Sequence, residues 1–105
     1  MTDRIYRDVS EIRRANVAAD HHFFDADAMA FFDSRIEDGG KVYGGRYFIT
    51  SEQFHFRGEA FPRKYTIRRA DADGTVHTVL GTWQEYASMI EARAAAEAIA
   101  SHVTT

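Results

Sequence analysis

The sequence predicts an α+β domain in which an antiparallel sheet of three to four strands has N-terminal helices and a C-terminal helix packed on one face. Apolar residues recur with helical spacing at both ends of the 105-residue chain, and apolar and polar residues alternate in its middle. No repeat and no linker rich in glycine, serine or proline divides the chain. One domain spanning residues 1–105 is therefore expected.

Two helices are expected before the sheet. Asp8 can cap the exposed amides of a helix over residues 9–19, and Glu11 follows at the position that completes a capping box. A second, short helix is expected over residues 25–32, because acidic residues at its start favour the positive end of the helix dipole.

The sheet is expected in the middle of the chain, where tyrosine, phenylalanine, isoleucine and threonine are frequent. Strands are predicted over residues 46–51, 64–70 and 75–80. The last two form a hairpin, because residues 71–74 read as a tight turn that ends in glycine. A further short strand is predicted over residues 82–86.

The C-terminal helix is expected over residues 89–102. Ser88 and Glu91 match a capping box, and apolar residues follow every three or four positions from Met89 to Val103. Alanine dominates the middle of this apolar stripe, so the helix can lie close to the sheet.

The composition excludes several classes of protein. Without cysteine, the chain cannot form a disulfide scaffold, a thiolate zinc site, an iron–sulfur cluster or a cysteine nucleophile. Its charged start reads as neither a signal peptide nor a membrane anchor, so a cytoplasmic location is expected.

Histidines and carboxylates offer little evidence of catalysis. Asp20, His22 and Asp25 could converge on a metal only if the backbone turns there, and a role at the end of the first helix explains His21 and His22 better. Carboxylate pairs elsewhere open helices or flank turns, where backbone capping explains them. No Gly-x-Ser-x-Gly turn and no complete nucleotide loop is present, so neither an enzyme nor a metal or cofactor is expected.

The charge is unevenly distributed along the chain. The net charge is -4 over residues 1–40, +5 over residues 41–70 and -4 over residues 71–105. The middle segment also holds half of the 14 aromatic residues. Basic and aromatic residues together can bind a nucleic acid, although an ordinary sheet with one solvated face has the same composition.

Strict alternation divides the predicted strands into two faces. The face expected to meet the helices carries Tyr47, Ile49, Tyr65 and Ile67. The opposite face carries basic residues, threonine and one aromatic residue. Its nucleic-acid-binding candidates are Arg46, Phe48, Lys64 and Arg68.

The connection over residues 52–62 is long for a hairpin loop. Phe54 and Phe56 could fold back to cap the core or form an extra strand, and this interpretation is favoured because exposed clusters of phenylalanine promote aggregation. If the loop is exposed instead, it is a contact surface for a protein partner. The partner-binding candidates are then Phe54, Phe56, Arg57 and Phe61.

Several runs of residues resemble a small family of unknown function that occurs in bacteriophages and bacterial mobile elements. They are His22–Phe24, Met29–Arg35, Gly45–Glu52, Tyr65–Arg69 and Trp83–Tyr86, and the resemblance extends to about residue 100. It implies an accessory protein in the cytoplasm of a bacterial host. It implies no activity, cofactor or catalytic residue.

Two function classes follow. The first is a non-enzymatic binding protein of a phage or mobile element that acts by protein–protein contact, for example as an inhibitor of a host defence system such as a CRISPR nuclease. The second is a nucleic-acid-binding module that uses the basic, aromatic sheet face, and the acidic ends of the chain count against it. A host protein is therefore the expected partner, nucleic acid is the alternative, and no membrane is expected.

Overall fold

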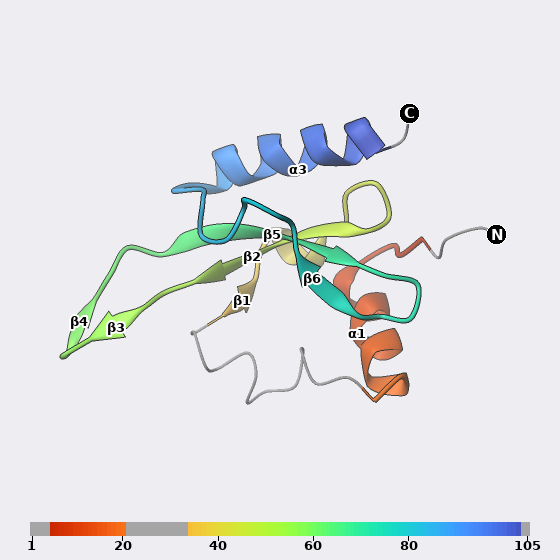
Figure 1. Cartoon of the computed structure of the whole chain (residues 1–105), viewed down its shortest axis with the longest axis horizontal. Coiled ribbons are helices and arrows are strands. Elements are labelled where there is room, and N and C mark those ends of the chain that lie inside the picture. The colour runs from red at the N-terminus through yellow and green to blue at the C-terminus, as the bar shows by residue number, and fades with distance from the viewer. Residues whose placement is uncertain (1–4, 21–33, 104–105) are drawn as a thin grey trace.

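A computed structural model describes residues 5–20 and 34–103 of the chain (Figure 1). Its elements follow in the order α1 (Val9–Ala18), β1 (Arg35–Ile36), η1 (Asp38–Gly40), β2 (Tyr47–Glu52), β3 (His55–Phe56), β4 (Glu59–Ala60), β5 (Lys64–Ala70), β6 (Val76–Thr78) and α3 (Met89–Val103). The helix expected over residues 25–32 lies outside the described residues. Within those residues, no helix is both long and apolar enough to cross a membrane.

The main sheet has four antiparallel strands in the order β1-β2-β5-β6. Strand β2 pairs with β5 over its whole length, from Tyr47 opposite Arg69 to Glu52 opposite Lys64. The predicted hairpin of β5 and β6 is confirmed, and so are the α+β class and the helices that precede and follow the sheet in the chain.

The prediction of a strand over residues 82–86 is wrong. This segment makes one isolated bridge, between Tyr65 and Tyr86, and forms no strand. Gln84 has a φ of 50°, which interrupts an extended backbone. The backbone amide of Gln84 instead donates to the Thr66 hydroxyl at 2.9 Å, so the Thr66 side chain holds the segment at the edge of β5.

Helix α3 covers one face of the sheet, above it in Figure 1. The buried residues on this face are those expected from alternation, and Tyr65 packs at their margin. Ile49 and Ile67 are fully buried and pack with Ala92 and Ala96 of α3. The small alanine side chains let the helix approach the strands closely, which explains the alanine-rich stripe.

Helix α1 packs with the opposite face rather than the one covered by α3. Phe48 is fully buried there in a cluster with Ile12, Val9 and Tyr6. Because Phe48 and Ile49 are neighbours in one strand, their side chains must point to opposite faces. The sheet is therefore the middle layer between two helices, whereas the sequence suggested helices on one face only.

Helix α1 is fixed to the turn between β5 and β6. Asn16 is buried and donates from Nδ2 to the Gly74 carbonyl at 2.8 Å, and the Tyr6 hydroxyl donates to the Asp71 carbonyl at 2.6 Å. A Cβ at position 74 would collide with the backbone of Asn16, and Gly74 has a φ of 85°. Glycine is thus required here for both close approach and backbone conformation.

A second polar contact joins η1 to α3. The Tyr43 hydroxyl donates to the Asp38 carboxylate, and Arg93 Nη2 donates to the other Asp38 oxygen at 3.1 Å. The hydrogen bond from Tyr43 lowers the pKa of Asp38 below its ordinary value. Burial, and then the hydrogen bond to Asp38, raises the pKa of Tyr43 to about 12.

Candidate protein-interaction arm

The hairpin of β2 and β5 continues beyond the sheet as a projecting ribbon, at the left of Figure 1. We call residues 53–64 the arm. Its two short strands pair at His55 with Ala60 and at Phe56 with Glu59. One further backbone hydrogen bond, from the Phe61 amide to the Phe54 carbonyl, continues the ladder toward the sheet, and the Gln53 side chain donates from Nε2 to the Phe61 carbonyl. The arm is therefore an ordered extension of the sheet.

A one-residue irregularity separates the arm from the sheet. Between the pairs Glu52–Lys64 and His55–Ala60, the first strand contributes two residues and the second contributes three. An extra residue in one strand is a β-bulge, which bends the ribbon and increases its twist. Pro62 lies at this point, where its missing amide hydrogen breaks no strand pairing.

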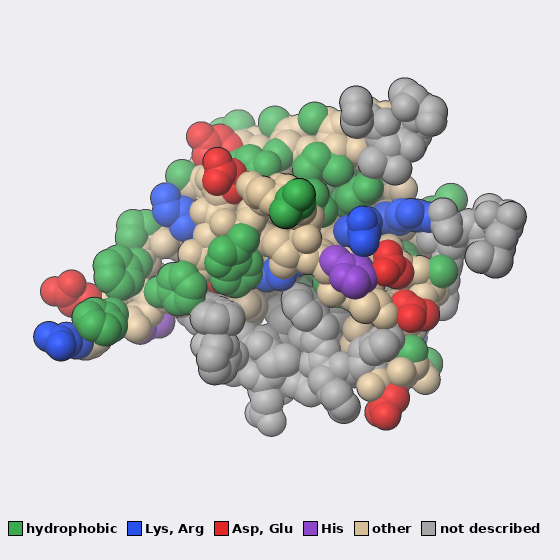
Figure 2. Space-filling view, in the orientation of Figure 1, with side chains coloured by type: hydrophobic (Ala, Val, Ile, Leu, Met, Phe, Trp, Pro, Cys, Tyr) green, Lys and Arg blue, Asp and Glu red, His purple; other side chains and the backbone are tan. Residues whose placement is uncertain are grey.

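The arm carries an aromatic face, which we define as Phe54, Phe56 and Phe61. Phe54 and Phe56 are two residues apart in one strand, and Phe61 lies opposite Phe54, so all three point to the same side. Their exposed fractions are 38% for Phe54, 61% for Phe56 and 47% for Phe61. In Figure 2, hydrophobic side chains run along the arm toward the body of the molecule.

These exposures decide between the two interpretations of the loop. The connection forms two additional short strands, and an extra strand was one of the two outcomes of the favoured interpretation. Its phenylalanines do not cap the core, because the ribbon continues the direction of β2 and β5 away from both helices. All four residues expected to bind a partner, Phe54, Phe56, Arg57 and Phe61, lie on this one exposed ribbon.

Arg57 occupies the tip of the arm in an unusual conformation. Arg57 and Gly58 form a two-residue loop with φ values of 50° and 82°. Such loops favour Asn-Gly or Gly-Gly, because side chains other than asparagine and aspartate resist positive φ. The Arg57 guanidinium carbon lies 5.2 Å from the centre of the Phe56 ring. The tip of the arm thus carries an exposed arginine over a phenylalanine ring.

The base of the arm is anchored by a buried ion pair. Glu52 is fully buried, and its Oε2 atom lies 2.9 Å from Nη2 of Arg68, which is 5% exposed. Two threonine hydroxyls also donate to Glu52, from Thr50 at 2.8 Å and from Thr66 at 2.7 Å. These hydrogen bonds compensate for removing the carboxylate from water, so the strand leading into the arm is held rigidly.

Sequence reasoning missed this ion pair, although a signal was present. Alternation places Glu52, Arg68 and the threonines on one face of the sheet, together with Thr78, which accepts from Arg68 Nη1. The Trp83 ring covers the Arg68 guanidinium, at 5.1 Å from its centre. Glu52 and Arg68 are therefore two cross-strand positions apart on one face, and their opposite charges could have suggested an ion pair.

Two of the four residues expected on an exposed basic and aromatic sheet face are buried. Phe48 is fully buried, and Arg68 is buried beside Glu52, which neutralises its charge. Alternation identified the correct side for both, but it could not show that α1 covers that side. Arg46 and Lys64 remain partly exposed, and they lie at opposite ends of β2 and β5.

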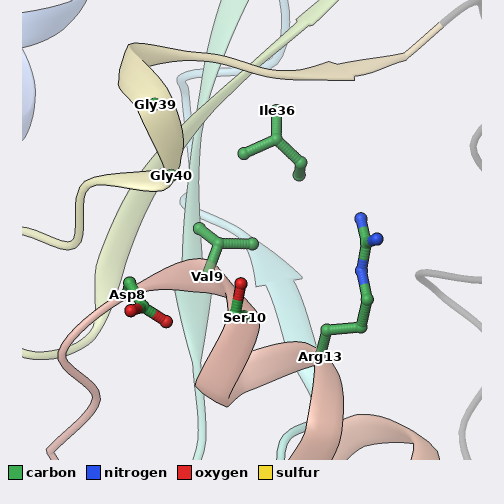
Figure 3. A pocket seen from close by; sticks show the side chains of 7 residues that line it. All are labelled: Asp8, Val9, Ser10, Arg13, Ile36, Gly39 and Gly40. Atoms are coloured by element: carbon green, nitrogen blue, oxygen red, sulfur yellow. The ribbon is translucent and has the colours of Figure 1, made fainter.

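Other polar groups in the described part of the chain lie at a pocket and at a surface pair. A pocket of about 330 Å³ lies between the first turn of α1 and the segment containing β1 and η1 (Figure 3). Arg13 and the N-cap Asp8 are its charged lining residues, and Asp8 accepts a hydrogen bond from the Glu11 amide. His77 Nε2 lies 2.7 Å from Asp71 at the surface. Across residues 5–20 and 34–103, no group of three histidine or carboxylate side chains is placed to hold a metal.

The predictions for His21, His22 and Asp25, a metal site or a role at the end of the first helix, fall on residues outside the described ones. Among the acid pairs, Asp73 caps a turn as expected, because its Oδ1 atom accepts from the Thr75 amide at 3.0 Å. His77 is paired across strands with Arg69.

Comparison with known proteins gives one match. Residues 8–97 match a family described as a family of unknown function (DUF7447). The chain belongs to this family. No curated protein and no solved structure matches it.

The DUF7447 region begins at the N-cap of α1 and ends within α3. It therefore contains the whole sheet, the arm and the buried ion pair at its base. The expected membership in a family of unknown function is confirmed.

Proposed function

We propose that this protein is a non-enzymatic binding protein that acts by protein–protein contact through the arm. The observation that carries the proposal is the aromatic face, whose three phenylalanines are exposed on a projecting ribbon. Exposed apolar clusters are unfavourable in water and are typical of surfaces that a partner covers. Aromatic and arginine side chains also dominate the binding energy of protein interfaces.

The shape of the arm supports the same proposal. A two-stranded ribbon on its own has little stability in water, so a projecting one needs a firm base. The Glu52–Arg68 pair and its threonines provide that base. Holding the aromatic face in position before binding reduces the entropy that is lost when a partner binds.

The resemblance to a family from phages and mobile elements favours a bacterial host protein as the partner. Inhibition of a host defence system, such as a CRISPR nuclease, is the form of this function that we put forward for testing. An inhibitor of this kind needs only a surface that blocks its target, and the arm is such a surface.

The test is capture of partners from a bacterial lysate by three immobilised forms of the protein. Phe56→Ser removes the most exposed phenylalanine of the arm, and Ile90→Ser is the matched control, because Ile90 is 78% exposed on α3. We expect a host protein that binds the unchanged protein and Ile90→Ser but is reduced at least tenfold with Phe56→Ser. Equal capture by all three forms would contradict the proposal.

A further inference from the structure

The charge of the arm differs from that of the rest of the molecule. Residues 53–64 contain Arg57, Arg63, Lys64 and one acid, Glu59, so their net charge is +2. The remaining residues have a net charge of -5. An aromatic face with basic residues at its two ends is electrostatically complementary to an acidic surface.

From this distribution we propose that the arm docks into an apolar cleft of a partner protein whose rim carries carboxylates, and that Arg57 recognises them. This inference rests on the proposed function and adds the chemistry of the partner. The phenylalanines fill the cleft, while a bidentate arginine–carboxylate contact at the tip fixes the direction in which the arm enters.

The conformation of Arg57 supports a role in recognition. Arginine in a left-handed conformation is less stable than asparagine at the same turn position, by an amount on the order of 1 kcal/mol. The turn would therefore form more easily with asparagine, yet an arginine is present at φ 50°. Its contact with the Phe56 ring orients the guanidinium beside the aromatic face.

The arm of a second copy is a poorer fit for the aromatic face. Arg57 lies at the tip of the arm, and Arg63 and Lys64 lie at its base. If two arms packed tip to tip, their Arg57 side chains would meet. If they packed tip to base, Arg57 would meet Arg63 and Lys64. Like charges approach in both arrangements, which disfavours the pairing of two arms.

Nucleic acid is also a poorer fit. Glu59 is paired with Phe56 in the arm, so its carboxylate lies on the side of the aromatic face. A phosphate backbone on this face would be repelled by Glu59 and by the acidic body. A protein cleft can instead place a basic or neutral group opposite Glu59 and acidic groups opposite Arg57.

The experiment uses a photoreactive benzophenone at the arm as the probe. Phe61→p-benzoylphenylalanine is irradiated in a bacterial lysate, and the same probe at Ile90 is the control. We expect position 61, and not position 90, to form an adduct with one bacterial protein, at a peptide segment containing aspartate or glutamate. Adding Arg57→Glu or Arg57→Asn should reduce the adduct at least tenfold, and Arg57→Lys should reduce it by a smaller factor, because lysine keeps the charge but cannot make the bidentate contact.

The outcomes separate the two proposals. An adduct that is unchanged by Arg57→Glu would overturn the acidic cleft while leaving the binding function intact. An adduct with nucleic acid or with a second copy would also overturn it. If position 61 forms no more adduct than position 90, both proposals fail. Loss of folding cannot explain an effect of Arg57→Asn, because asparagine suits this turn and the melting temperature should stay equal or rise.

Discussion

Strands β2 and β5 are buried between two helices in the body of the molecule, and the same two strands continue past Glu52 and Lys64 into the exposed arm. In the body, Phe48 is completely enclosed by other side chains, whereas in the arm Phe56 is 61% exposed. The two phenylalanines lie only eight residues apart in one continuous stretch of chain. The comparison shows that residue type and strand pattern do not distinguish a side chain needed for folding from one available for binding.

The two regions also treat arginine differently. Arg68 in the body is buried, paired with Glu52 and covered by the Trp83 ring. Arg57 in the arm is exposed and sits in a backbone conformation that arginine disfavours. We therefore expect changes in the body to alter stability, and changes in the arm to alter binding.

The largest effect on stability should come from Phe48→Ala. Removing this buried ring opens a cavity between α1 and the sheet, and the expected loss is about 3–5 kcal/mol of unfolding free energy. Urea unfolding monitored by circular dichroism measures it. A loss no greater than that of Phe56→Ala would remove the distinction between the two regions.

Arg68→Met should destabilise the protein by about 3–4 kcal/mol, because it leaves the Glu52 carboxylate buried without its cation. Replacing both partners, with Glu52→Leu added, should recover much of this loss, because no buried charge then remains. The same urea curves measure both variants. If the double variant were the less stable one, the pair would be a net source of stability.

A smaller effect is expected from the contact between η1 and α3. The pKa of Tyr43 is about 12 in the folded protein and near 10 when unfolded, so the stability linked to it is full below pH 10 and is lost as the pH rises toward 12. Tyr43→Phe should cost about 1.5–2 kcal/mol at neutral pH and should remove this alkaline loss. Unfolding free energies at pH 8 and pH 11 test both statements, and an unchanged alkaline loss in Tyr43→Phe would contradict them.

The smallest effects on stability should come from the arm. Phe56→Ser should change the unfolding free energy by no more than about 0.5 kcal/mol, because its side chain is exposed, and Arg57→Asn should raise it by no more than about 1 kcal/mol, because asparagine suits the left-handed turn. Thermal unfolding followed by calorimetry provides the measurement. A large destabilisation by Phe56→Ser would mean that the arm contributes to the fold, and the comparison would no longer hold.

Much of the fold followed from the sequence, since its signals are local. Capping residues and helical spacing identified α1 and α3, and the glycine turn identified the β5–β6 hairpin. Alternation identified the face that meets α3, including Ile49 and Ile67. Each of these features depends on residues that are close together in the chain.

What the sequence could not provide depends on which segments meet in space. Alternation put Phe48 and Arg68 on one side, but only the position of α1 and the Glu52 pair shows that this side is interior. The strand expected over residues 82–86 failed because a distant hydroxyl, that of Thr66, holds Gln84 in a turn. The phenylalanines of the arm were identified as candidates, and only the direction of the ribbon shows that they are exposed.

The most direct test of the account is capture with a trimmed arm. Replacing residues 54–61 by Asn-Gly closes the hairpin next to the base and leaves the Glu52–Arg68 pair and both helices in place. We predict that this variant unfolds cooperatively within about 1 kcal/mol of the unchanged protein and captures none of the partner retained by Ile90→Ser. Undiminished capture by the folded, trimmed protein would contradict the claim that the arm is the binding site.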